Sequence, residues 1–365
     1  MFKRIYFFFI SYIVATTYSQ TLLLFWFFKN GLSPMNLLFY VLFQCIFSLL
    51  IYFFIKGRSI ESRKSLFLGV LFSFSGVIVA SQIVHPYHAF VVSFMFGLTN
   101  VFFWTIYNTM YFKYSDKEEH GLKSGMYFLF FPIIGAIFAP FSGFIVEKFS
   151  FSFLFLSSAF FYVIPLAIVY YLPSFTFKFE VKEAFFELEN KMLVFMQGYI
   201  SMFRFAFISI FTLFFITTPF KFGSFFGYLA ILSTLTALLN SKISDKIKNR
   251  AFFFYFFTIL DTLTYIPMAL TKSFGLWQVF TGINNITTNL SDPFSVTLVL
   301  DHAKLNRENT MLAREIYLNL GRICVVVIAI IALYYSSSFM TSFLVVSFGT
   351  ILYPIIAYYN KAYLK

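Results

Sequence analysis

Several charged residues of this sequence lie within long apolar stretches, where little water would solvate them. Long hydrophobic stretches hold two arginines and three acids, namely Arg204, Asp261, Asp292, Glu315 and Arg322. Each such group costs about 2.5–3.5 kcal/mol when it is placed at the centre of a lipid bilayer. Two arginines leave one of the three acids without a cation, and an unmatched buried acid tends to hold a proton or to bind a cation. These residues are therefore the first candidates for chemistry.

The spacing of the polar residues groups them on helix faces. Two rows repeat the spacing i, i+4, i+7, which places their members on one side of a helix: Asn285, Asn289 and Asp292 in the first row, and Glu315, Asn319 and Arg322 in the second. Asp261 belongs to neither row, and we expect it to pair with a neighbouring helix. A buried charge network that only fixes helix packing is the alternative to a chemical role for all of these groups.

The composition decides what kind of element carries these residues. Of the 365 residues, 60% are hydrophobic, 24% aromatic and only 12% charged, whereas soluble domains carry roughly a quarter charged residues. This excludes a soluble enzyme, a disordered chain, a disulfide scaffold and, despite the net charge of +12, a nucleic-acid binder. A polytopic all-α membrane protein remains.

Apolar stretches long enough to cross a bilayer divide the chain into two sets of six. The first six spans are expected at 5–28, 35–55, 65–84, 89–112, 124–146 and 149–172. The second six are expected at 192–217, 222–240, 251–271, 273–300, 310–335 and 338–359. We therefore predict an N-terminal six-helix bundle (1–172), a cytoplasmic linker (173–191) and a C-terminal six-helix bundle (192–365). In the linker, Val181, Phe185 and Leu188 share one helical face, which we expect to lie on the inner membrane surface.

Lysine and arginine are distributed unevenly between the two sides of these spans. They crowd the segments on the side of the two termini, whereas the other loops hold only Lys29, Lys148, Lys221 and Lys272. The positive-inside rule then places both termini in the cytoplasm. We expect the plasma membrane as the location.

The two halves also match each other at a shift of about 185 residues. Asn100, Trp104 and Tyr107 fall opposite Asn285, Asn289 and Asp292. A chain built from two homologous six-helix halves is typical of transporters with a central site.

Three motifs make the chain resemble the major facilitator superfamily. The loop after the eighth span contains Asp245, Lys246 and Arg250, and the loop after the second span contains Gly57, Glu61 and Arg63. Both are similar to the loop signature of the family. The fifth span carries Gly135, Pro140 and Gly143, which resembles a helix-packing motif of proton-driven exporters in that family, with Ala139 and Phe144 in place of two of its glycines.

The resemblance implies a fold and a set of roles. The fold is two pseudo-symmetric six-helix bundles around a cavity, and the two loops would gate it. Spans one, four, seven and ten would line that cavity, which makes its expected substrate residues Gln20, Asn100, Trp104, Asn108, Arg204, Asn285 and Asn289. Asp292 or Glu315 would carry a coupling proton, stabilised by Arg322 or Arg204.

The expected function is secondary active transport of a small organic solute by alternating access, with proton-coupled export as the leading version. An uncoupled facilitator is one alternative, and a receptor or a membrane enzyme is the other. We expect a monomer in the lipid bilayer whose partners are its solute and protons or another ion. No cofactor, metal or nucleic acid is expected.

Overall fold

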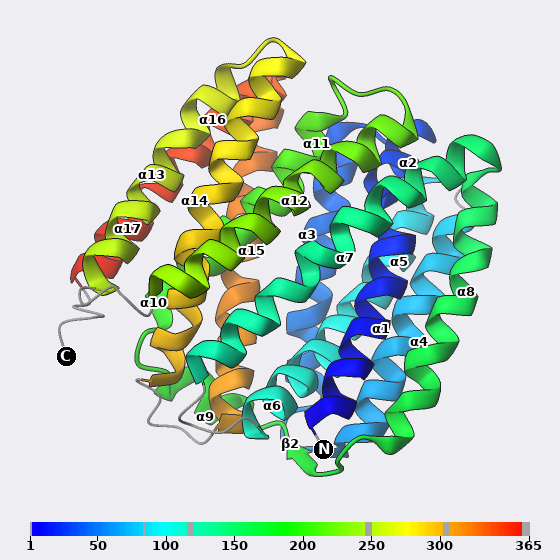
Figure 1. Cartoon of the computed structure of the whole chain (residues 1–365), viewed down its shortest axis with the longest axis vertical. Coiled ribbons are helices and arrows are strands. Elements are labelled where there is room, and N and C mark those ends of the chain that lie inside the picture. Colours follow the sequence, from blue (N-terminus) through cyan, green and yellow to red (C-terminus); the bar gives the residue numbers. More distant parts are fainter. Residues whose placement is uncertain (1, 83–84, 115–119, 245–249, 302–306, 360–365) are drawn as a thin grey trace.

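The structure, a computed structural model, describes all residues of the chain except 1, 83–84, 115–119, 245–249, 302–306 and 360–365. Long helices run side by side, with the first half of the chain on one side of the molecule and the second half on the other (Figure 1). Helices satisfy their own backbone hydrogen bonds, which a bilayer core requires of any segment that crosses it.

The first half contains eight α-helices: α1 (Phe2–Gln20), α2 (Leu23–Lys29), α3 (Pro34–Phe54), α4 (Ser62–Ser81), α5 (Pro86–Thr99), α6 (Ile106–Lys113), α7 (His120–Lys148) and α8 (Phe151–Ile168). The second half contains α10 (Lys191–Met202), α11 (Ser209–Thr212), α12 (Pro219–Ser244), α13 (Arg250–Leu270), α14 (Phe274–Asp301), α15 (Arg307–Ser336), α16 (Phe339–Thr350) and α17 (Leu352–Tyr359).

Most of the expected spans are long and apolar enough to cross a membrane. Ten such segments occur among the described residues, at the positions of spans one to eight, eleven and twelve. The ninth span is α13, whose apolar stretch is shorter and covers Phe254–Leu270. The tenth is α14, which has 28 residues and so spans about 42 Å at 1.5 Å per residue, although it is rich in Asn, Thr and Ser.

Several spans are not continuous α-helices, and one of them, the twelfth, divides at Ile351 between α16 and α17. The first is interrupted after Gln20, between α1 and α2. The fourth and the seventh each contain a six-residue π-helical segment, η1 (Asn100–Thr105) and η4 (Phe203–Ile208). π-Helical turns are uncommon and concentrate at functional sites. The interruptions in the first, fourth and seventh spans lie at or beside Gln20, Asn100 and Arg204, three of the residues expected to line the cavity.

The linker folds onto the protein at one end of the bundle, which we name the linker end (Figure 1). Strand β2 (Thr176–Lys178) pairs antiparallel with β1 (Ser59–Glu61), with Ile60 opposite Phe177. Helix α9 (Val181–Glu187) follows and packs against α15. Its Val181 and Leu188 are buried, and Phe185 stacks on Tyr317 at 5.5 Å between ring centroids. The apolar face expected on the membrane surface thus covers another helix, which corrects that prediction.

At the opposite end, which we name the far end, serine side chains begin several helices. Ser33, Ser150 and Ser338 each accept a hydrogen bond from the backbone N–H three residues later. Such N-caps satisfy one of the exposed N–H groups at a helix start. They fix where α3, α8 and α16 begin.

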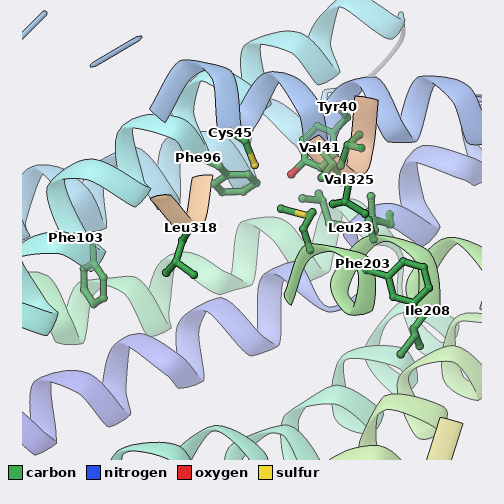
Figure 2. Close-up of a cluster of buried hydrophobic side chains, with 14 of the residues drawn as sticks. Leu23, Tyr40, Val41, Cys45, Phe96, Phe103, Phe203, Ile208, Leu318 and Val325 are labelled. Atoms are coloured by element: carbon green, nitrogen blue, oxygen red, sulfur yellow. The ribbon is translucent and has the colours of Figure 1, made fainter. Parts of the chain in front are cut away.

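Two helix pairs make extensive contacts between the halves. Helix α7 packs along α12, and α3 packs along α15. Figure 2 shows Tyr40 and Val41 of α3 beside Val325 of α15, and Cys45 near Phe96 of α5. The outer surface is apolar and aromatic, as a lipid-facing surface must be.

Candidate functional site

A central cavity of about 880 Å³ lies between the two halves. It is lined by α1, α2, α3, α5, η1, α6 and α7 from the first half and by α10, η4, α11, α12, α13, α14, α15 and α17 from the second. All of the residues expected to bind solute or proton border it: Gln20, Asn100, Trp104, Asn108, Arg204, Asn285, Asn289, Asp292, Glu315 and Arg322. A volume of this size is typical of a site for a small organic molecule.

An ion pair stands in the second-half wall. The Nη2 atom of Arg204, in η4, lies 3.3 Å from both carboxylate oxygens of Asp292 on α14. The Arg204 side chain is 18% exposed and that of Asp292 is 40% exposed, so the carboxylate is the more accessible partner. An acid that is accessible from a cavity can exchange protons with the water in it.

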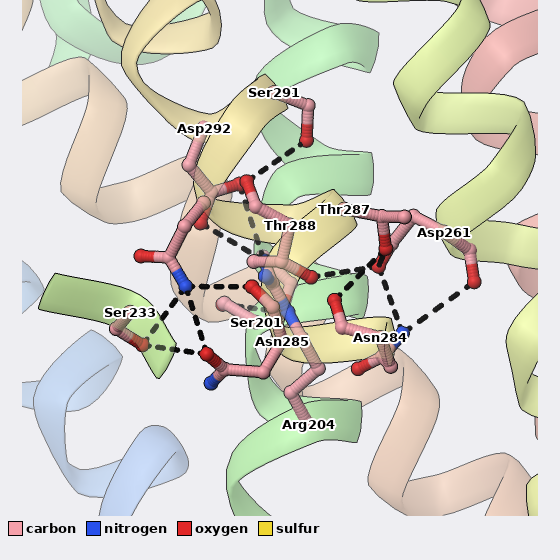
Figure 3. A network of polar contacts seen from close by, with 12 residues as sticks. Ser201, Arg204, Ser233, Asp261, Asn284, Asn285, Thr287, Thr288, Ser291 and Asp292 are labelled. Carbon is pink, nitrogen blue, oxygen red and sulfur yellow. Dashed lines mark hydrogen bonds and ion pairs between the residues drawn. The ribbon is translucent and has the colours of Figure 1, made fainter. Parts of the chain in front are cut away.

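A chain of neutral groups continues from this pair along α14 (Figure 3). Ser233 of α12 donates its hydroxyl to Asn285 Oδ1 at 2.7 Å, and Asn289 Nδ2 donates to Ser233 Oγ at 3.0 Å. The row Asn285, Asn289 and Asp292 therefore shares one face of the helix and is held by α12 and η4.

Asp261 of α13 forms the centre of a second network. Its Oδ1 accepts hydrogen bonds from Asn284 Nδ2 at 2.8 Å and from Thr288 Oγ1 at 2.7 Å, and its Oδ2 accepts one from Tyr265 at 3.2 Å. Two of these donors belong to the neighbouring helix α14. The side chain also borders the cavity, and the charge of Arg204 acts on it as well as on Asp292.

The row on α15 connects the halves. Glu315 Oε1 accepts a hydrogen bond from Asn108 Nδ2 of α6 at 3.2 Å and one from Arg314 Nη1 at 3.2 Å. Further along the helix, Arg322 Nη1 donates to Asn319 Oδ1 at 3.3 Å. Glu315 is thus a cavity acid in direct contact with the other half of the molecule.

The first-half wall is polar but carries no charge among its described lining residues. Gln20 Nε2 donates to Ser73 Oγ at 3.0 Å and to the Tyr162 hydroxyl at 3.1 Å. In η1, Asn100 Nδ2 donates to Ser48 Oγ at 3.2 Å. These neutral hydrogen bonds hold the described part of the wall in place without an acidic or basic side chain.

The expected gating loop after the second span binds the linker. Gly57 adopts φ +74°, a left-handed conformation that favours glycine, and its N–H donates to the Phe179 carbonyl at 2.9 Å. Arg63 Nε donates to the Leu172 carbonyl at 2.6 Å, and Ser174 donates to Glu61 Oε1 at 2.8 Å. In the loop after the eighth span, Asp245 and Lys246 lie outside the described residues, and so does the side chain of Arg250.

The small residues of α7 face small residues of α12. A Cβ added to Gly143 would lie 2.6 Å from the Pro219 carbonyl oxygen, and one added to Gly227 would lie 2.6 Å from Pro140 Cγ. Nearer the linker end, a Cβ at Gly135 would contact Ala230 at 3.1 Å. These residues let the two helices approach closely, and we call this contact the α7–α12 seam.

Sequence reasoning missed several cavity residues. Arg314 stands one residue from Glu315 near a helix end, where the positive-inside rule alone accounts for a base, yet its side chain is only 17% exposed and borders the cavity. Ser233, Asn284 and Thr288 went unnoticed because hydroxyl and amide residues are common in α12 and α14. The position of Asn284 one turn ahead of Thr288 was the available signal. In the described part of the chain, no group of three His, Cys, Asp or Glu side chains could hold a metal ion.

Comparisons with known proteins agree on one fold. Comparison with curated proteins finds no relative. Among solved structures, the chain is similar to a POT family transporter in complex with a thioalcohol-conjugated peptide, with a TM-score of 0.75 and 13% identity, covering 99% of this chain and 96% of that one.

Two further structures share the architecture. A D-xylose–proton symporter matches with a TM-score of 0.69 and 12% identity, covering 97% of this chain and 94% of that one. The transporter FucP in its outward conformation matches with a TM-score of 0.63 and 11% identity, covering 98% of each chain. The sequence profile of the Major Facilitator Superfamily matches residues 4–321. With most of its length matched, the chain belongs to this superfamily of multi-pass membrane transporters and is not an enzyme.

Proposed function

We propose that the chain is a proton-coupled secondary transporter that exports a small organic solute by alternating access. The bundles 1–172 and 192–365 would move against each other around the cavity, joined by the linker 173–191. We place both termini in the cytoplasm because of the distribution of lysines and arginines, and we propose the plasma membrane as the location. It would work as a monomer, since one chain surrounds the whole cavity.

The observation that carries the coupling proposal is the ion pair between Arg204 and Asp292. While Asp292 is ionised, it holds the guanidinium of Arg204 at 3.3 Å. A proton on Asp292 removes that attraction and frees Arg204, so proton binding changes the charge that the solute meets. Asp261 lies in the same electrostatic field and would then become the acid that balances Arg204.

Glu315 connects protonation to movement of the halves. Its hydrogen bond from Asn108 joins α15 to α6, and hydrogen bonds to an ionised acceptor are roughly twice as strong as neutral ones. Protonation of Glu315 would weaken this connection between the bundles. Asp292 would thus sense the proton, and Glu315 would release the halves.

The proposed direction rests on the α7 motif. Gly135, Pro140 and Gly143 resemble the helix-packing motif of proton-driven exporters, and they form the α7–α12 seam. If an inward proton gradient instead drives solute into vesicles together with protons, the chain is an importer and the proposed direction is wrong.

The test is solute flux into proteoliposomes under imposed pH gradients of both signs, with a broad solute panel. We expect accumulation of at least one solute to follow the gradient, and we expect Asp292→Asn and Glu315→Gln to abolish accumulation while leaving downhill exchange. Glu189→Gln, at an exposed linker position, serves as the control. Unchanged coupling in both cavity variants would refute the proton role, and gradient-independent flux of the unmodified chain would identify an uncoupled facilitator.

A further inference from the structure

The cavity holds three arginines and three acids, and these do not pair completely. Arg204 binds Asp292 at 3.3 Å, and Arg314 binds Glu315 at 3.2 Å. Asp261 is surrounded by hydroxyl and amide donors. This leaves one guanidinium in the cavity wall without an acid.

That guanidinium belongs to Arg322. Its one hydrogen bond to a described residue goes to the neutral amide of Asn319, at 3.3 Å, and no carboxylate among those residues lies within 4.0 Å of it. Arginine stays protonated and offers five N–H donors. A partly buried cation with a single neutral acceptor is costly in a membrane protein, so its retention calls for a partner that enters from the cavity.

The described residues around Arg322 offer no such anionic partner. Gln44 and Cys45 of α3 line the same cavity, and Cys45 is close enough to interact electrostatically with Arg322. These groups are neutral. The described first-half residues that line the cavity include no acid at all, so movement of the halves brings none to Arg322 from that wall.

We infer that Arg322 binds an anionic oxygen group, a carboxylate or a phosphate, of the transported solute. The guanidinium fork matches both groups in a two-point geometry. The aromatic lining residues Phe96, Trp104 and Phe131 suit an apolar body attached to that group. This inference names the solute class of the proposed transporter and so rests on that proposal.

Binding of small probes to the purified full-length chain tests it without any gradient. The probes are benzoate, phenyl phosphate and their neutral counterpart benzamide, and the readout is the shift of the thermal unfolding temperature, which rises with ligand concentration relative to the dissociation constant. We expect benzoate or phenyl phosphate to stabilise the chain at millimolar concentrations and benzamide to have much less effect. Benzoate alone would indicate a carboxylate solute, and phenyl phosphate alone a phosphate ester.

Three variants assign the effect to the residue. Arg322→Gln should weaken anion binding by about tenfold or more, as expected for the loss of a charge-assisted hydrogen bond, while Arg322→Lys should weaken it less because it keeps the charge. Arg58→Gln, in an exposed loop, should leave binding unchanged. If Arg322→Gln does not fold, the lysine variant still tests the two-point geometry.

Equal stabilisation by benzamide, no stabilisation by either anion, or an anion effect that persists in Arg322→Gln would overturn the inference. Asp292→Asn separates this result from the proposed coupling, since that variant should lose gradient-driven accumulation and still bind the anion. If the unmodified chain binds anions through Arg322 but shows no proton-driven flux, the proposed proton coupling is refuted and the anion site at Arg322 is supported.

Discussion

The first-half wall of the cavity is polar and uncharged among its described residues, whereas the second-half wall carries six ionisable side chains: Arg204, Asp261, Asp292, Arg314, Glu315 and Arg322. Yet the two walls come from matching helices. Asn100 and Trp104 stand at the positions of Asn285 and Asn289 in the repeat, and all four border the cavity. The difference teaches that a duplicated scaffold keeps its geometry while one copy takes over the charges.

The same contrast holds for the buried networks of the two halves. In the first half, Gln20 and Ser73 meet at the hydroxyl of Tyr162. In the second, Asn284 and Thr288 meet at the carboxylate of Asp261. A neutral hydroxyl costs little to bury when it is hydrogen-bonded, whereas a carboxylate remains costly without a cation. We therefore expect substitutions of buried polar residues to lower the free energy of unfolding more in the second half than in the first.

The largest expected loss of stability follows from removal of Arg204, one of the cavity arginines. Arg204→Gln removes the guanidinium that binds Asp292 and should destabilise the fold by about 3 kcal/mol, the lower end for a broken buried ion pair, because Asp292 is 40% exposed. Thermal unfolding in detergent measures it. The double variant Arg204→Gln/Asp292→Asn should recover most of the loss, and equal stability of the single and double variants would contradict the pairing.

A direct comparison of the two networks comes next. Asp261→Ala leaves buried amide and hydroxyl donors unsatisfied and should cost about 2 kcal/mol. Tyr162→Phe, in the neutral network, should cost about 1 kcal/mol, the usual net value of one hydrogen bond. Chemical denaturation of both variants under the same conditions provides the test, and a larger loss for Tyr162→Phe would reverse the contrast drawn here.

A smaller effect is expected at the contact where the two walls meet. Asn108→Ala removes the hydrogen bond to Glu315 and should lower the free energy of unfolding by about 1 kcal/mol, while solute exchange becomes faster because the halves separate more easily. Stopped-flow exchange in proteoliposomes reports the rate. Asn100→Ala, which lies in the same half and bonds to Ser48 within it, is the matched control and should leave the exchange rate nearer to that of the unmodified chain.

The smallest effect concerns the linker, outside both walls. Hydrogen bonds from Asn309 and Lys178 lower the pKa of Glu180 to about 2. Since an acid with a lowered pKa stabilises the folded state above its ordinary pKa of about 4.5, the contact of α9 with α15 should persist at neutral pH and weaken as the pH falls from about 4.5 towards 2. Hydrogen exchange of α9 amides should rise over that interval. In Glu180→Gln, exchange should be higher already at neutral pH and respond less to acid.

Hydrophobicity predicted the positions of the spans well because a lipid environment selects strongly for length and apolar character. The helical spacing of Asn285, Asn289 and Asp292 likewise placed them on one face. The π-helical segments η1 and η4 could not be foreseen, since a single extra residue per turn leaves no mark in composition. The cavity position of Arg314 could not be predicted because a base near a helix end usually reflects the orientation of a membrane protein. The apolar face of α9 was wrongly assigned to the membrane surface because lipid and a neighbouring helix select the same apolar residues.

The α7–α12 seam has a mechanical consequence. Its closest contacts lie near the far end, where Gly143 meets Pro219 and the Phe220 N–H donates to Glu147 at 3.1 Å. If these far-end contacts stay in place while the halves rotate, movement is small there and larger at the linker end, where the hydrogen bond from Asn108 to Glu315 and the ion pair between Lys113 and Glu308 would have to break. A membrane core is about 30 Å thick, so each degree of rotation about the seam would part the opposite ends by about 0.5 Å. A methyl group added at Gly143 would therefore push α7 and α12 apart at the far end, and its small displacement there would be multiplied at the linker end.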